Sequence, residues 1–581
     1  MMKSRITAAE MKAIDINASR LGMEPLLLME NAGRAVAEII AAHIRSEDMK
    51  NKKTGQPEGK QSDNPPKVFL FAGLGNNGGD VFVAARHLDN FEISSAIILT
   101  GTKQQIKTLE ARKNYDLLKQ SDRIKTIELK SESDLKEIVK DENNILVIAD
   151  GIFGTGFSGK AAGIEKEAIE TINLIREKNK TVFVLSVDIP SGLEAAAVSL
   201  AGDDKEGETE TKNIRNGETE EETKRRNAGD ETIVAADSTV TFHKMKTYLE
   251  EPKNKRFAGE IIVKQIGVPE NAEKYVGAGD LAALYRRDLK SKKGDSGKIM
   301  VVAGGTYTGA PALAGMAALR TGCDIAAVAA PRQIYDAVAS FSPELIVKKL
   351  SADLLSEEDI PILKELIPVY DAVIIGPGLG SEPTVLKTVA ELIPVIQKAV
   401  IDADAIRPEI MDALEKRPHP SKTEIILTPH YGEFCRLADF CGIKVAAKRD
   451  ENTAAELEKY TAEICEKLNV TVLLKGATDF ICGNECGRYN ATGNSGMTIG
   501  GTGDVLAGIV GGLLAKNKAF ESACCGAFIC GTAGDMAYEK KGNALIPSDM
   551  LKKIPKAIHF ENKSKMKKQN KSKNKIDQKT K

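Results

Sequence analysis

Short aliphatic runs alternate with segments of helical periodicity along most of this 581-residue chain. Examples are KVFLFAG (67–73), NILVIAD (144–150) and KIMVVAG (298–304), each followed by a loop rich in glycine or acidic residues. Strands that alternate with helices are typical of a parallel β-sheet with crossover helices. A single core rarely grows beyond about 250–300 residues. We therefore predict two α/β domains, with ligands held in loops at the carboxyl ends of the strands.

Four polar stretches divide the chain. Residues 46–66 are polar with three prolines, which predicts a surface insertion, and residues 203–231 hold almost no aliphatic side chains, which predicts a disordered loop. A linker is expected near residues 268–295. The tail from 559 to 581 contains nine lysines and is expected to be solvated. The predicted domains are residues 1–270, with insertions at about 46–66 and 203–231, and residues 276–558.

The composition argues against several classes of protein. A net charge of −1 gives no overall attraction to nucleic acid or to acidic membranes. No stretch reaches the ~18 uncharged apolar residues of a membrane helix, and the first residues have no apolar signal segment. CGNEC (482–486) lacks a second ligand pair, so the nine cysteines indicate reduced thiols rather than zinc. We expect a cytoplasmic protein without nucleic-acid or membrane partners.

The stretch GGTGDVLAG (500–508) places Asp504 directly behind three glycines and at the start of an apolar helix. The amino end of a helix after a glycine-rich turn can hold phosphate. No Lys follows the glycines, so this is not a Walker A loop. We interpret the glycine N–H groups as an anion site. Asp504 would accept the hydroxyl proton of a second substrate.

This stretch resembles the G-x-G-D signature of the ribokinase-like superfamily. GGTYTGAPALAGMAALRTG (304–322), GPGLG (376–380), TPHYGEF (428–434), LKGATD (474–479) and GNSGMTIGGTGD (493–504) narrow the resemblance to the NAD(P)HX dehydratases. Those enzymes use ADP or ATP, with Mg²⁺, to remove water from the S hydrates of NADH and NADPH (NADHX and NADPHX). The resemblance implies a ribokinase-like α/β domain with the same activity, releasing AMP or ADP and phosphate.

The resemblance also implies site residues in this half. Asp504 would be catalytic. The hydrate-binding residues would be Ala310, Gly378, His430 and Asp504, and the nucleotide-binding residues would be Lys475, Gly476, Ala477, Thr478, Asp479 and Gly503. Three of them have structural alternatives: His430 could cap the next helix, Lys475 could be a surface lysine, and Gly378 could serve turn geometry alone.

In the N-terminal half, GLGNNGGD (73–80) lies between a predicted strand and a predicted helix. Gly73, Gly75 and Gly78 meet the G-x-G-x-x-G spacing, which alone is a weak dinucleotide signal. Asp150 and Asp188 each follow a later strand, and acids at strand ends of a parallel sheet converge on one crevice. Helix capping is the alternative for either acid.

This combination resembles the NAD(P)HX epimerases, which interconvert the R and S hydrates, over about residues 5–270, with a Rossmann-like parallel sheet implied. The implied hydrate-binding residues are Asn76, Asn77, Gly78, Gly79, Asp80, Gly154, Thr155, Gly156, Phe157, Ser158, Gly159, Lys160 and Asp188. Asn77, Asp150 and Ser191 match the family's K⁺ ligands, and Asp188 is our candidate acid/base. Val81 stands where the family usually has Gly; a β-branched residue disfavours positive φ, which predicts a different local turn.

The sequence thus predicts a bifunctional enzyme of nicotinamide-cofactor repair. The resemblance also implies a homo-oligomer, because family members commonly assemble. One alternative is a ribokinase-like small-molecule kinase with a non-catalytic N-terminal binding domain. A second is an N-terminal scaffold of the kind found in mRNA-decapping proteins. Retention of both Asp150 and Asp188 argues against a non-catalytic N-terminal half.

Overall fold

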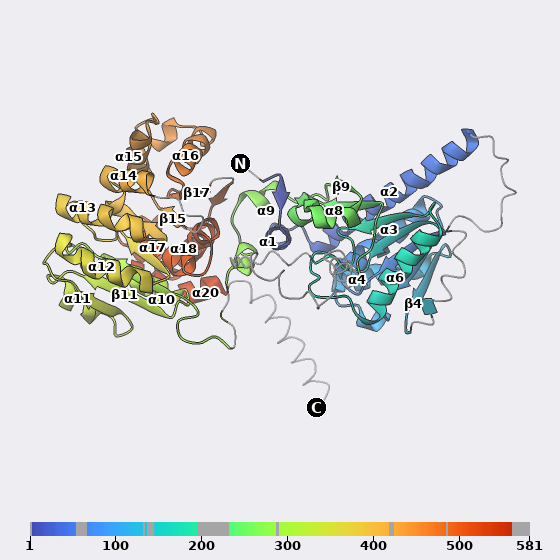
Figure 1. Ribbon diagram of the computed structural model, residues 1–581, viewed down its shortest axis with the longest axis horizontal. Helices are drawn as coiled ribbons and strands as arrows, with labels where there is room; N and C mark the ends of the chain where they lie inside the picture. Colours follow the sequence, from blue (N-terminus) through green and yellow to red (C-terminus); the bar gives the residue numbers. More distant parts are fainter. Residues whose placement is uncertain are drawn as a thin grey trace, which may run out of the picture. The chain divides into compact units, whose positions relative to one another are not determined.

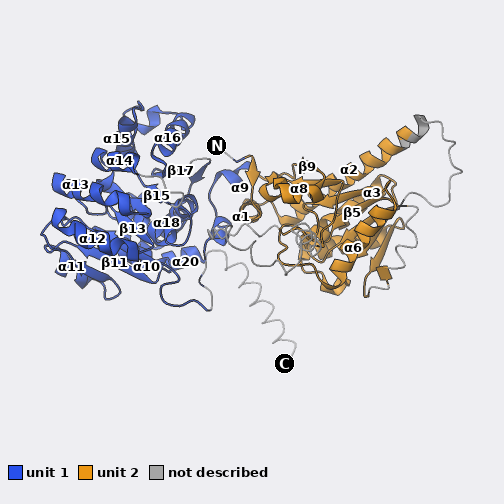
Figure 2. Ribbon diagram, in the orientation of Figure 1, with its two compact units in different colours: residues 1–3, 270–581 blue, residues 4–269 orange. Residues whose placement is uncertain are grey.

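The computed structural model describes residues 3–53, 67–131, 134–135, 145–194, 232–285, 287, 290–417, 423–483 and 486–559. Two compact units divide the chain (Figure 2): Ser4–Pro269, the N-terminal unit, and Glu270–Lys581 with Met1–Lys3, the C-terminal unit. The segment 203–231 and the tail beyond residue 559 lie outside the described residues. No described helix is both long and apolar enough to cross a membrane.

The N-terminal unit is built on a seven-stranded sheet of order β4-β3-β2-β5-β6-β7-β9, in which every pair is parallel. The strands are β2 Lys67–Ala72, β3 Ser95–Leu99, β4 Ile124–Glu128, β5 Ile145–Gly151, β6 Phe183–Val187, β7 Ser238–Phe242 and β9 Glu260–Lys264; β1 Arg5–Ile6 and β8 Met245–Lys246 pair separately. The strand order reverses between β2 and β5. Loops after these strands therefore open a crevice at the edge where the sheet's carboxyl ends lie.

Helices cover both faces of this sheet (Figure 1). The helices are α1 Ala8–Arg20, α2 Pro25–Lys53, α3 Asn76–Asn90, α4 Leu109–Leu117, α6 Gly163–Lys178 and α8 Pro252–Ala258. Leu70 and Val147 face α2 and α3, whereas Phe71 and Ile148 face α6. Successive strand residues point to opposite faces, so both faces must be apolar.

Helix α2 corrects one expectation. The insertion was expected to begin at residue 46, but the helix continues to Lys53. The residues from 46 to 53, SEDMKNKK, include Glu, Met and Lys, which are good helix formers, so polarity alone did not end the helix. Residues 54–66 lie outside the described residues.

The C-terminal unit contains a nine-stranded sheet of order β12-β11-β10-β13-β14-β15-β16-β17-β18. The strands are β10 Lys298–Val302, β11 Ile325–Ala330, β12 Ile346–Lys349, β13 Ala372–Ile375, β14 Lys398–Ile401, β15 Glu424–Leu427, β16 Thr471–Leu474, β17 Asp479–Cys482 and β18 Gly487–Asn490. The first seven in this order are parallel, and β17 and β18 add antiparallel strands at one edge. The order reverses between β10 and β13, which again marks a ligand crevice.

Two helical layers enclose this second sheet. The helices are α9 Glu270–Lys274, α10 Gly309–Arg320, α11 Tyr335–Phe341, α12 Ile360–Leu366, α13 Pro383–Leu392, α14 Pro408–Lys416, α15 Tyr431–Cys441, α16 Ala454–Leu468, α17 Thr502–Leu514, α18 Ala519–Lys541, α19 Pro547–Leu551 and α20 Ile554–Ile558. Ile374 and Val400 pack with α10 and α17 to α20, and Ile375 and Ile401 pack with α12 to α16. The α/β class predicted from the aliphatic runs is confirmed in both units.

The segment expected as a linker belongs instead to the C-terminal unit. Val276, Ala278 and Leu281 lie in its core, and Asp280 pairs with Arg488 at 2.6 Å. Isolated apolar residues in a polar stretch gave no periodicity from which this packing could be predicted.

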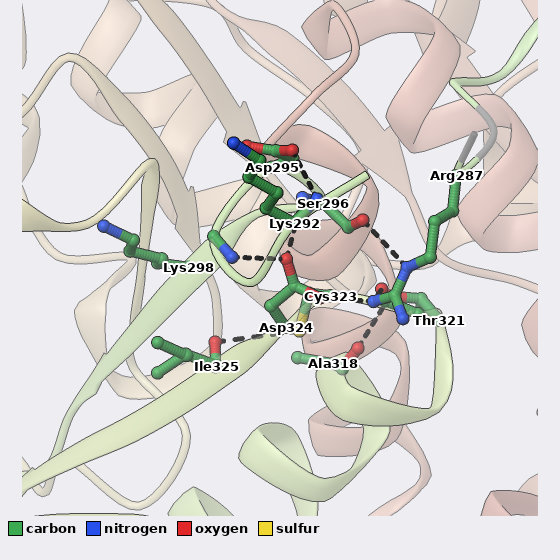
Figure 3. A network of polar contacts seen from close by, with 12 residues as sticks. Arg287, Lys292, Asp295, Ser296, Lys298, Ala318, Thr321, Cys323, Asp324 and Ile325 are labelled. Atoms are coloured by element: carbon green, nitrogen blue, oxygen red, sulfur yellow. Dashed lines mark hydrogen bonds and ion pairs between the residues drawn. The ribbon is translucent and has the colours of Figure 1, made fainter. Parts of the chain in front are cut away.

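Asp324 anchors the end of the same segment (Figure 3). Its carboxylate accepts hydrogen bonds from the N–H groups of Gly294 at 2.7 Å and Ser296 at 2.9 Å, and it pairs with Arg287. The pKa of Asp324 lies below its ordinary value. Burial alone would raise it, but the N–H groups of Ser296 and Gly294 and the Arg287 guanidinium together outweigh burial. The chain entering β10 is therefore fixed to the turn before β11.

The nine cysteines are free thiols, and seven of them are buried. Three lie on α18: Cys524, Cys525 and Cys530. Burial raises the pKa of all three, that of Cys530 to about 12.

Helices α10 and α17 approach so closely that Gly508 has no room for a side chain. A Cβ there would lie 2.2 Å from the Ala314 carbonyl oxygen. We expect Gly508→Ala to lower the free energy of unfolding of the C-terminal unit by about 1–3 kcal/mol through overpacking. Urea unfolding measures this. Gly309→Ala, where nothing lies within 4 Å, is the matched control, and equal stability of the two variants would contradict the close packing.

Candidate active sites

The amino end of α17 is open to a ligand. Its N-cap, Gly501, has φ 98° and provides no capping side chain, and Asp504 lies in the first turn. Only glycine adopts such a φ without strain. The first N–H groups of the helix therefore have no side-chain acceptor, as an anion site requires.

Beside this helix end, a lysine and an aspartate from two strand ends meet a glutamate from the first turn of α15. Lys475, directly after β16, donates to Asp402 Oδ1 at 2.8 Å and lies 3.9 Å from Glu433 Oε2. Asp402 follows β14 and also accepts the Thr428 hydroxyl at 2.8 Å. A Cβ on Gly503 would lie 3.7 Å from Lys475 Nζ, so this pair borders the amino end of α17.

The charges around Asp504 determine how it titrates. Burial raises its pKa to about 6; Asp402 and Asp404 add to this rise, and Lys475 opposes it. Burial alone would lower the pKa of Lys475, but Asp402 and Glu433 outweigh burial and raise it. Lys475 is therefore a charged, partly enclosed lysine, and the surface-lysine alternative is wrong.

Two residues predicted to bind the hydrate lie side by side. Gly378 has φ 65°, and a Cβ there would lie 3.1 Å from the Ala310 Cβ. Glycine suits both this positive φ and this close approach. Gly378 therefore serves the turn, as its structural alternative states, and also lies beside Ala310.

His430 is the N-cap of α15, as its structural alternative predicted. Its Nδ1 accepts the Glu433 N–H at 3.2 Å, while the Glu433 carboxylate accepts the His430 N–H at 2.8 Å. The ring remains largely exposed, with a 59% accessible side chain. Hydrate binding by His430 stays a prediction.

The predicted nucleotide residues 475–479 form a turn between β16 and β17. Asp479 accepts the Gly476 N–H at 2.9 Å, and Arg449 donates to the carbonyl oxygens of Lys475 at 2.5 Å and Thr478 at 2.9 Å. Beside the turn lies a pocket of about 500 Å³. Its lining residues are Arg449, Asp450, Asn452, Ala454, Leu457, Thr478, Phe480 and Tyr489.

Three residues of this site were not predicted: Asp402, Glu433 and Arg449. Asp402 could have been found, because it follows a buried strand just as Asp188 does. Glu433 shows only the spacing of a capping box. No local signal marks Arg449, whose partners lie 26 and 29 residues away.

In the N-terminal unit, the loop after β2 touches the loop after β5. A Cβ on Gly73 would lie 1.9 Å from the Ile152 carbonyl oxygen, so glycine is needed for this approach. Asn77 Nδ2, in the first turn of α3, donates to the carbonyl oxygens of Phe153 at 2.8 Å and Val187 at 3.0 Å. The crevice between β2 and β5, where the strand order reverses, thus brings together the carboxyl ends of β2, β5 and β6.

The predicted K⁺ ligands meet in this crevice. Asp150 is completely buried and accepts the Ser191 N–H at 2.8 Å, the Ser191 hydroxyl at 2.5 Å and the Ser186 hydroxyl at 2.9 Å. Burial raises the pKa of Asp150, although these hydrogen bonds oppose the rise. A buried carboxylate among hydroxyl, amide and carbonyl oxygens fits a hard monovalent cation. In the part of the chain that is described, no three His, Cys, Asp or Glu side chains form a metal site.

The loop predicted to bind the hydrate, residues 154–160, follows β5. A Cβ on Gly154 would lie 3.2 Å from the Asn77 Cβ, and Phe157 stacks on Phe153 with ring centroids 4.1 Å apart. Gly159 donates its N–H to Glu194 at 3.1 Å. The loop therefore borders the amino end of α3.

Asp188 and Asp80 face a common polar region. Asp188 follows β6 with φ 65°, and its Oδ1 accepts the Thr241 hydroxyl at 3.2 Å. Desolvation raises the pKa of Asp80 well above its ordinary value, and the carboxylates of Asp188 and Asp15 add to the rise. Neither Asp150 nor Asp188 is the N-cap of any helix that the structure describes.

Val81 is part of a helix, not of the turn before it. It lies inside α3 without a positive φ and is completely buried. Its Cγ2 would lie 2.2 Å from a Cβ on Gly151, so the valine fills the space above that glycine. The helix begins five residues earlier, so this position requires no positive φ, and a turn different from that of the family stays a prediction.

These features define an α/β protein with two ligand crevices, one of them opening on a carboxylate at a glycine-rich helix start. Residues 299–556 match the family described as NAD(P)H-hydrate dehydratase, and residues 26–248 match the YjeF-related protein N-terminus. The chain belongs to the family of bifunctional NAD(P)H-hydrate repair enzymes.

Its relatives match over nearly the whole chain. The bifunctional NAD(P)H-hydrate repair enzyme Nnr of Archaeoglobus fulgidus is 36% identical over 553 residues, which are 95% of this chain and 98% of that protein. Nnr of Methanocaldococcus jannaschii is 35% identical over 562 residues, 96% and 94% of the two chains. The structure of an ADP/ATP-dependent NAD(P)H-hydrate dehydratase from Bacillus subtilis with ATP/Mg²⁺ has a TM-score of 0.40, 24% identity, and coverage of 49% of this chain and 98% of that one.

The Asp402–Lys475 pair predicts a large stability effect. Lys475→Met leaves the buried Asp402 carboxylate without its cation, and we expect the free energy of unfolding of the C-terminal unit to fall by about 3–5 kcal/mol. Urea unfolding at pH 7 measures the change. Lys387→Met breaks an exposed pair with Glu357 and is expected to leave stability unchanged. A similar small effect in both variants would contradict the argument.

Proposed function

We propose that this chain repairs hydrated nicotinamide cofactors. Its N-terminal unit interconverts the R and S forms of NADHX and NADPHX, and its C-terminal unit dehydrates the S form to NADH or NADPH. The observation that carries the proposal is the meeting of Asp504, Lys475 and Asp402 at the open amino end of α17. Family membership supports both activities.

The dehydration we propose is driven by phosphoryl transfer. Hydroxide is a poor leaving group, so the C6 hydroxyl must first be activated. Asp504 accepts the hydroxyl proton while the C6 oxygen takes the terminal phosphoryl group, and AMP leaves from ADP, or ADP from ATP. The lone pair of the ring nitrogen then expels phosphate from C6, and loss of a C5 proton restores the dihydronicotinamide ring.

The chain's own groups suit these steps. The N–H groups after Gly501 and the Lys475 ammonium face charge that builds on the transferred phosphoryl group. We propose that Ala310, Gly378 and His430 hold the hydrate, and that residues 475–479 with Gly503 hold the nucleotide. Carboxylates at Asp402 and Glu433 suit a hard cation, and Mg²⁺ bound with the nucleotide would neutralise phosphate charge there.

For the epimerase, we propose Asp188 as the acid/base. Inversion at C6 breaks and remakes one bond at that carbon, through an iminium ion or an opened ring, and either route moves the hydroxyl proton. Residues 76–80 and 154–160 would hold the hydrate beside it. We propose K⁺ at Asn77, Asp150 and Ser191, where it would balance the buried Asp150 charge and fix the two loops.

We also propose a cytoplasmic location, which the free thiols support, and a homo-oligomeric state, to be tested by light scattering. The donor is decided by running the same assay with ADP and with ATP. A small-molecule kinase would instead yield a stable phosphorylated alcohol, so release of free phosphate together with NADH separates the two functions.

Asp504→Asn should lower the rate of S-hydrate dehydration by about 10²- to 10⁴-fold, because it removes the general base. In the parent, a pKa of about 6 means that Asp504 is protonated at lower pH, so kcat/KM should fall as pH drops below about 6. Regained absorbance of the reduced nicotinamide measures both. A parent rate independent of pH between 5 and 7 would contradict this role.

Asp188→Asn should lower the rate of R-hydrate consumption by about 10²- to 10⁴-fold while S-hydrate dehydration continues at the parent rate, because only the epimerase loses its acid/base. Asp504→Asn is the reciprocal control: it should interconvert the hydrates without forming NADH. Chromatography of the two hydrates without nucleotide measures epimerisation directly. Unchanged R consumption by Asp188→Asn would exclude Asp188 as the acid/base.

A further inference from the structure

Lys246, the last residue of β8, carries a deeply buried charge. Its side chain is only 1% exposed, and an ammonium group removed from water needs close oxygen partners. Its Nζ donates to the carbonyl oxygens of Phe242 at 2.6 Å and Lys244 at 3.3 Å, and lies 3.5 Å from Asp188 Oδ1. Two of its three N–H bonds thus have carbonyl acceptors, and the Asp188 carboxylate lies within ion-pair distance. Asp188 alone among the three partners is charged.

The two oxygens of Asp188 therefore differ. Oδ1 is held by Lys246 and by the Thr241 hydroxyl at 3.2 Å, whereas no described residue donates to Oδ2. The Asp188 side chain is 14% exposed, and its backbone is fixed in the left-handed region at φ 65° by a 2.7 Å bond from its N–H to the Val240 carbonyl oxygen. A non-glycine residue keeps such a conformation only where its surroundings impose it.

Other titratable groups lie near Asp188 on three elements. These groups are Asp15 on α1, Asp80 on α3 and Tyr248 in the short helix Thr247–Glu250, and His243 after β7 lies near Asp15. Burial raises the pKa of Asp15 to about 6; Asp188 adds to the rise, and Lys246 and His243 oppose it. Asp15 and Asp188 thus both lie near the charge of one buried lysine, and Asp188 forms the ion pair with it.

We propose that Lys246 is a positioning residue of the epimerase: it acts through Asp188, fixing Oδ1 and supplying the counter-charge that leaves Oδ2 free to take the substrate proton. At 1% exposure Lys246 does not touch the substrate. The inference rests on the proposed function and adds to it a second residue, which neither glycine motif contains.

The test uses the full chain and the epimerisation of purified S hydrate without nucleotide. Lys246→Met should lower kcat by about tenfold or more with little change in KM. The acidic limb of its pH profile should also move to higher pH by about one unit, because a carboxylate that loses its cation binds protons more tightly. Lys246→Arg should restore most of the rate. Lys253→Met, at a 73% exposed lysine of the same unit, should match the parent.

A double-mutant cycle separates positioning from a structural role. In an Asp188→Asn background, Lys246→Met should cause no further loss, because its effect passes through the carboxylate; losses that multiply would overturn the proposal. Lys246→Gln, which keeps donors without charge, serves where Lys246→Met does not fold. If Lys246→Met or Lys246→Gln kept the parent's kcat and pH profile, the positioning role of Lys246 would also be overturned. An unaltered chain that cannot epimerise would overturn the proposed function as well.

Discussion

Both sites depend on the direction of the strands. Parallel strands bring their carboxyl ends to one edge, and in each unit acidic residues lie at those ends: Asp402 just after β14, Asp150 near the end of β5 and Asp188 just after β6. Carboxylates gathered in a partly buried crevice repel one another, and the loss of hydration adds to the cost. The rest of each site consists largely of groups that offset this concentration of negative charge.

The two units offset it in different ways. In the C-terminal unit, Lys475 stands at a strand end with a 21% exposed side chain, where its charge can reach a bound phosphate. In the N-terminal unit, Lys246 is enclosed by its own β7–β8 turn and can act only on its neighbours. Asp150 pairs with no lysine in the described part of the chain and accepts hydrogen bonds from hydroxyl and N–H donors instead. The two lysines thus differ in exposure: the one that we propose to meet the nucleotide is partly exposed, and the one that we propose to order a carboxylate is buried.

Much of the architecture was predictable, because aliphatic runs and helical periodicity are local signals. Glycines that permit a close approach, such as Gly73, were visible for the same reason. The antiparallel β17–β18 edge and the packing of Val276 into a core were not visible, since both depend on partners distant in the chain. Strand-end position alone would have revealed Asp402, but its pairing with Lys475 spans 73 residues and needed the fold.

The burial of the thiols affects how readily peroxide oxidises this protein. Peroxide attacks the thiolate, and a cysteine whose pKa is raised to about 12, like Cys530, presents almost none at neutral pH. Burial also raises the pKa of Cys524 and Cys525, which lie on the same helix, α18. Helix α18, which packs against α17, therefore presents little thiolate at these three positions for oxidation to sulfenic acid.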